Sequence, residues 1–68
     1  VTVAPMGISG ESTADPTIAN GQILGIYPIG NQDQFVTNLE ITAEHKAKVT
    51  LGSAATAPNI FNVVILKK

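Results

Sequence analysis

Side chains able to carry out chemistry are few in this chain, and they are spread along its length. His45 is the single histidine, and three serines stand in segments of turn-forming residues. Nucleophilic catalysis needs a serine, a histidine and a carboxylate held together, yet no G-x-S-x-G turn surrounds Ser9, Ser12 or Ser53. We therefore predict no catalytic residue and interpret His45 as part of a turn.

The acidic side chains do not form a recognisable site either. They are Glu11, Asp15, Asp33, Glu40 and Glu44. Glycoside hydrolysis needs two carboxyl groups facing each other across a cleft, roughly 5–10 Å apart, and a 68-residue β domain has little room for one. The sequence has no D-x-D-x-D-G calcium loop, no phosphate-binding glycine motif and no cysteine. It predicts no metal, no cofactor and no enzymatic activity.

Composition indicates an apolar surplus. Hydrophobic residues make up 44% of the chain and charged residues 13%, against about a quarter in a typical soluble domain. A folded chain of this size exposes roughly 4,000 Å² and usually needs a disulfide, a metal or a partner. Without cysteines, association is the remaining means of stabilisation. The alternative is a compact, weakly charged β domain that stays soluble by itself.

Nucleic acid and membranes are poor partners for such a chain. The net charge is −1, there is no arginine, and the four lysines stand in two pairs, Lys46 with Lys48 and Lys67 with Lys68. Binding to phosphates requires a denser group of cations. No apolar run approaches the ~18 residues that a membrane span needs.

Four segments have the composition of β-strands: 22–29, 34–42, 46–51 and 60–67. In the second, Phe35, Leu39 and Ile41 are expected to face the core. In the third, alternation predicts that Ala47, Val49 and Leu51 point inward. The short connection between these two segments favours an antiparallel hairpin, with Glu40 or Thr42 near the lysines.

The first and last of these segments carry positional signals. Gly25 suggests a bulge or a close backbone approach, and Pro28 predicts that its strand lies at a sheet edge. Segment 60–67 is apolar on both faces, which indicates a central strand or one covered by a partner. The predicted fold is therefore all-β, a small antiparallel β-sandwich or open barrel of about four strands.

Residues 1–6 are predicted to form an extended N-terminal arm, and residues 7–68 a single small β domain that includes a long loop over 7–21. The arm is either disordered or adds a strand to a neighbour's sheet. Apolar residues in these segments, and one aromatic, are the predicted partner-docking residues. They are Val1, Val3, Met6, Ile8, Ile18 and Tyr27.

Segments 35–42 and 48–56, with their alternating Val/Thr/Ile pattern and Gly-Ser-Ala-Ala-Thr loop, carry a family resemblance. Together with the arm, they resemble capsid decoration (cement) proteins of tailed bacteriophages. The resemblance implies a structural virion protein that assembles in the host cytoplasm. It would form a dimer or trimer and stabilise contacts between major capsid subunits at the capsid surface. The alternative is a carbohydrate-binding or adhesion module using Tyr27, Asn31, Gln32 and Asp33.

Overall fold

The structure, a computed structural model, describes residues 1–18 and 22–66. Its strands are β1 (Thr2–Val3), β2 (Ser9–Glu11), β3 (Gln22–Pro28), β4 (Val36–Ile41), β5 (Ala47–Leu51) and β6 (Asn59–Leu66). One 3-10 turn, η1, covers Pro16–Ile18. In this part of the chain there is no α-helix, and no helix is long and apolar enough to span a membrane. The predicted all-β class is confirmed.

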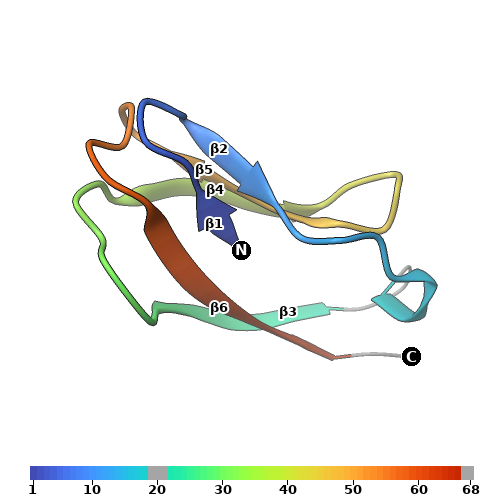
Figure 1. The fold of residues 1–68 in the computed structure, drawn as a ribbon. Coiled ribbons are helices and arrows are strands. Elements are labelled where there is room, and N and C mark those ends of the chain that lie inside the picture. The colour runs from blue at the N-terminus through green and yellow to red at the C-terminus, as the bar shows by residue number, and fades with distance from the viewer. Residues whose placement is uncertain (19–21, 67–68) are drawn as a thin grey trace.

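Two three-stranded antiparallel sheets make up the fold (Figure 1). One has the strand order β1-β6-β3 and the other β2-β5-β4. Each sheet turns one face to a shared interior and the other to solvent, as antiparallel sheets commonly do. The β1–β2, β3–β4 and β5–β6 connections gather at one end, whereas η1 and the β4–β5 turn lie at the other (Figure 1).

The structure has six strands where the sequence predicted about four. The four predicted strands correspond to β3, β4, β5 and β6, with described ends shifted by at most two residues; Lys67 lies outside the described residues. The other two strands fall in the predicted arm and the predicted loop. In β1, Thr2 pairs with Ile60 of the chain's own sheet, and in β2, Ser9 pairs with Thr50. Strands of two or three residues are too short for alternation to reveal.

The β4–β5 hairpin largely follows the predicted pattern. Ala47, Val49 and Leu51 are buried, and Glu40 stands opposite Lys48, as expected. The prediction that Phe35 faces the core is wrong, because this side chain is 70% exposed.

A register shift between Val36 and Asn38 explains the error. The extra residue of such a bulge reverses the alternation, so Val36 packs on the core together with Leu39. The polar pair Thr37-Asn38 between these two apolar residues is the sequence signal of the bulge.

The core lies between the two sheets. Both contribute fully buried side chains, namely Val3 and Phe61 from β1 and β6, and Val49 and Leu51 from β5. The buried Ala55 closes the cluster from the β5–β6 connection. Burying a large aliphatic or aromatic side chain contributes about 1.5–3 kcal/mol, so this small cluster supplies much of the stability.

The turn between β4 and β5 contains a strained residue. His45 donates its backbone N–H to the Thr42 carbonyl over 3.0 Å, and Thr42 donates in turn to the Lys46 carbonyl over 2.8 Å. His45 has a φ of 63°, in the left-handed region. This matches a three-residue hairpin loop, in which that position favours glycine. The predicted role of His45 as a turn residue is confirmed.

Replacing His45 with glycine is expected to stabilise the protein. The left-handed conformation costs a non-glycine residue roughly 1–2 kcal/mol, and the greater freedom of glycine in the unfolded chain offsets part of that gain. We expect a net gain of about 0.5–1 kcal/mol, or roughly 2–8 °C in thermal melts. A lower melting temperature for His45→Gly would show that the imidazole makes a stabilising contact that outweighs the strain.

Candidate docking surface

The Ser12 hydroxyl and the backbone of His45 take part in local structure. The Ser12 hydroxyl accepts the Ala47 N–H over 2.9 Å and donates to the Thr13 carbonyl over 3.1 Å. The His45 carbonyl accepts the Asp15 N–H over 3.0 Å. The described residues contain no hydrogen bond between the imidazole and a serine, no pocket, and no group of three metal-ligating side chains. They offer no assembled catalytic or metal centre.

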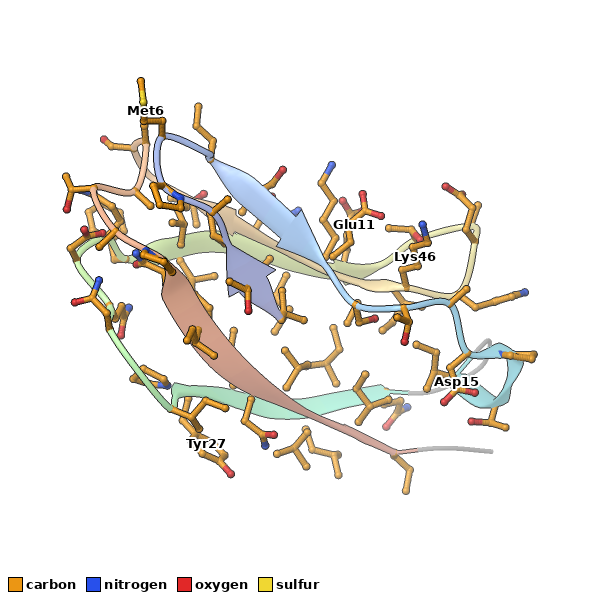
Figure 2. The ribbon with its side chains drawn as sticks, in the orientation of Figure 1. Met6, Glu11, Asp15, Tyr27 and Lys46 are labelled. Carbon is orange, nitrogen blue, oxygen red and sulfur yellow. The ribbon has the colours of Figure 1, made fainter. Side chains whose placement is uncertain are left out.

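The carboxylates whose contacts are seen bind their neighbours. Glu11 forms an ion pair with Lys46, with 3.7 Å between Oε2 and Nζ (Figure 2). Because both side chains are partly exposed, such a pair contributes at most about 1 kcal/mol. Asp15 accepts the backbone N–H and hydroxyl of Thr17 over 2.9 and 2.8 Å, which fixes the start of η1.

Asp33 ties two loops together. Its carboxylate accepts the backbone N–H of Thr56 over 3.0 Å, the Thr56 hydroxyl, and the Asn59 amide over 2.9 Å. Asn59 is fully buried, and its side-chain oxygen accepts the Asp33 N–H over 3.1 Å. The β3–β4 and β5–β6 connections are therefore joined by a polar clip of Asp33, Thr56 and Asn59. This use of Asp33 favours a structural role for the turn over sugar binding.

The clip predicts a dependence of stability on pH. The Thr56 hydroxyl and the Asn59 amide hold the pKa of Asp33 below its ordinary value. A carboxyl group whose folded-state pKa is lowered stabilises the fold above its unfolded pKa, and this contribution is lost as the pH falls through the folded pKa. We expect thermal stability to fall below about pH 4, and to fall less in Asp33→Asn. Equal slopes for the two proteins would contradict this role of Asp33.

Three apolar side chains project at the end of the molecule where the clip lies. Met6 is 86% exposed, Phe35 is 70% exposed and Ile8 is 54% exposed. Met6 and Ile8 come from the β1–β2 connection and Phe35 from the β3–β4 connection. All three are joined by backbone hydrogen bonds to segment 51–55: Met6 to Ala55, Ile8 to Leu51, and Phe35 to Gly52. We call Met6, Ile8 and Phe35 the apolar tip.

Met6 is held outward by an unfavourable backbone. The Gly7 N–H donates to the Ala4 carbonyl over 2.9 Å, which closes a turn with Pro5 and Met6 at its centre. Met6 has a φ of 67°, and His45 is the only other described non-glycine residue with positive φ. A turn with proline second and positive φ third normally carries glycine or asparagine in the third position. Figure 2 shows the Met6 side chain pointing away from the fold.

The predicted docking residues separate into surface and interior. Met6, Ile8 and Tyr27 are exposed, whereas Val3 and Ile18 are 0% and 3% exposed and belong to the interior of the domain. Val1 is partly buried and packs against the core. Val3 and Ile18 are thus unavailable to a partner in this conformation, because β1 pairs with β6 and η1 turns Ile18 inward.

The described chain thus presents a group of exposed apolar side chains and no assembled reactive centre. Comparison with protein-family models, with curated proteins and with solved structures found no match. The geometry of the apolar tip is therefore the main guide to function. Phe35 is the tip residue that sequence reasoning did not assign to docking, because the bulge that turns it outward was not anticipated.

Proposed function

We propose that this protein is a structural, non-catalytic domain, built as a small β-sandwich, that docks on a viral capsid shell and stabilises contacts between shell subunits. The observation that carries the proposal is the apolar tip, in which Met6, Ile8 and Phe35 stand exposed on one end of the molecule. Singly exposed apolar residues are common on protein surfaces, but a group at one end suggests an interaction site.

The backbone at Met6 strengthens this argument. Selection for stability alone favours glycine at φ 67°, and an 86% exposed methionine gains little from packing within the domain. Backbone strain that persists at an exposed apolar residue is more often found at binding sites than elsewhere. Burial of Met6 by a partner would explain why methionine, and not glycine, occupies this position.

A capsid shell suits a tip of this size. Three side chains give a small contact, and a small contact binds weakly by itself. When copies of the protein are linked, the binding of one copy raises the effective concentration of the next at its own site on a symmetric shell. Weak single contacts therefore suffice there. The resemblance of segments 35–42 and 48–56 to capsid decoration proteins supports this choice of partner.

Binding to particles tests the proposal. Purified protein is added to virus particles assembled from a culture in which its gene is deleted, and the bound fraction is measured after sedimentation. We expect saturable binding by the natural chain and about tenfold weaker binding by Met6→Gly, since burying one flexible apolar side chain is worth about 1.5 kcal/mol or more.

The matched control is His45→Gly, which relieves the same backbone strain at the other end of the molecule (Figure 1). Both variants are expected to melt at higher temperature than the natural chain, but only Met6→Gly should lose binding. Equal binding by Met6→Gly and the natural chain, or no binding by the natural chain, would refute the proposal.

A further inference from the structure

We propose that two copies of this chain associate face to face through the outer surface of the β1-β6-β3 sheet. This inference concerns a different surface from the apolar tip and does not depend on the shell as partner. Its consequence is a twofold dimer that carries two tips, one from each copy.

The residues of this surface follow from the strand register. Ile26 and Val63 stand opposite each other and pack on the core, so the neighbouring pairs Tyr27 with Asn62 and Gly25 with Val64 face outward. Side chains on one strand alternate between the faces, which places Leu66 and Ile60 outward as well. We define the outer apolar face as Leu24, Tyr27, Ile29, Ile60, Val64 and Leu66. Five of these are between 39% and 62% exposed, and Ile60 is partly buried.

Charge separates the two outer faces of the molecule. Strands β1, β3 and β6 contain no charged residue over their whole length. The outer face of the other sheet carries Glu11 and Glu40, with Lys48 between them on β5. A surface without charge can be buried against its own copy with no unpaired ion left inside. It also offers no pattern of charges that would select a different protein.

The open edge of β3 is a less suitable contact than its face. The register shift between Ile23 and Gly25 marks a bulge, and Pro28 ends the strand without a backbone donor. Bulges and prolines are the usual protection of an edge strand against pairing with another chain. The face has no such protection, since it lacks the lysines that commonly interrupt exposed apolar surfaces.

One position on the face carries no side chain. A Cβ atom placed on Gly25 would meet no atom within 4 Å, so the backbone is bare at this point. The exposed Leu24 and Val64 flank this position. In a twofold contact each copy supplies the same patch, so the protruding side chains of one copy can lie over the bare backbone at Gly25 of the other.

The area is smaller than that of a standard interface, which fits a weak dimer. The five exposed side chains present roughly 500 Å², taking about 180 Å² for a fully exposed large side chain. A standard interface buries about 800 Å² from each partner, which is a fifth of the 4005 Å² that this chain exposes. Thr2 and Gln22 at the rim, and Asn62 between Ile60 and Val64 on β6, supply part of the difference. We therefore expect dissociation in the micromolar range, at about 1–100 µM.

Sedimentation equilibrium of the full chain between about 5 and 500 µM tests the dimer, without particles. We expect the mass to rise with concentration from 7.1 kDa toward twice that value. Val64→Glu introduces a charge at the centre of the outer apolar face and should keep the protein monomeric at least tenfold higher in concentration. Thr50→Glu is the matched control, because it faces outward from the central strand of the other sheet.

Leu24→Ser provides a second variant on an exposed position should Val64→Glu fail to fold, as judged by thermal melting. A natural chain that stays monomeric, forms trimers, or loses association through Thr50→Glu rather than Val64→Glu would overturn the proposal. Met6→Gly should dimerise like the natural chain. The dimer and the shell-docking function can therefore fail independently.

Discussion

Gly10→Ala is expected to remove about 3 kcal/mol or more of the free energy of unfolding. β1 and β2 belong to different sheets and cross closely at Gly10. An added Cβ would overlap the Thr2 carbonyl oxygen and lie 2.9 Å from the carbonyl carbon. These are backbone atoms that cannot rotate away, so β1 must separate from β2. A domain of this size is stable by only about 3–10 kcal/mol, so the loss is a large share of the total.

Thermal melting measures the effect, which corresponds to roughly 12–24 °C for a domain of this length. Gly25→Ala is the matched control, since the added Cβ meets nothing within 4 Å and Gly25 does not have positive φ. We expect the control to stay within about 1 kcal/mol of the natural chain. Similar losses in both variants would mean that general strand effects, and not the crossing at Thr2, explain the result.

Asn59→Leu is expected to lower the free energy of unfolding by about 2–3 kcal/mol. Asn59 is fully buried, donates to Asp33 and to the Ala57 carbonyl, and accepts the Asp33 N–H. Leucine has a similar volume but forms none of these bonds, so the Ala57 carbonyl is left without this donor. The polar clip also joins the β3–β4 connection, which carries Phe35, to the β5–β6 connection, so its loss should weaken shell docking as well.

Chemical denaturation of Asn59→Leu measures this loss. The matched control is Asn38→Leu, which changes an exposed asparagine on β4. Surface substitutions of that kind usually stay within about 0.5 kcal/mol. If Asn59→Leu were as stable as the natural chain, the clip would contribute nothing to the fold, and the expected weakening of shell docking in this variant would have no basis.

Sequence patterns predicted the parts of this fold that repeat regularly. Alternation over 46–51 identified the three inward residues of β5, and Pro28 indicated that β3 is an edge strand. Segment 60–67 was expected to be either central or covered by a partner, and β6 does lie between β1 and β3. These predictions succeeded because each depends on the two-residue period of a strand or on the missing donor of proline.

The features that sequence reasoning missed depend on single residues or on distant contacts. β1 and β2 pair with strands some 40–60 positions away in the sequence. A strand of two or three residues is too short to carry a pattern that predicts such a pairing. Phe35 was assigned to the core because one bulge was enough to reverse its direction. The polar clip could not be predicted, because Asp33 and Asn59 meet only after both sheets have formed.

The apolar residues in excess divide into those that the domain buries and those that it leaves exposed. Val3 and Ile18 were predicted to meet a partner, yet the domain buries them itself. What remains outside is concentrated in the apolar tip and the outer apolar face. β1 and η1 therefore bury part of the apolar excess seen in the sequence, and the apolar residues left outside define the surfaces that we propose for docking.

Site-directed crosslinking from Met6 tests the central claim most directly. Met6 is the single methionine of the chain, so a photoreactive methionine analogue incorporated in its place reports on this position alone. On particles, we predict a crosslink to a shell subunit from Met6, and none when the methionine is moved to the charged face by Met6→Gly with Thr50→Met. Equal crosslinking from both positions, or none from Met6 on particles that carry the protein, would contradict the account.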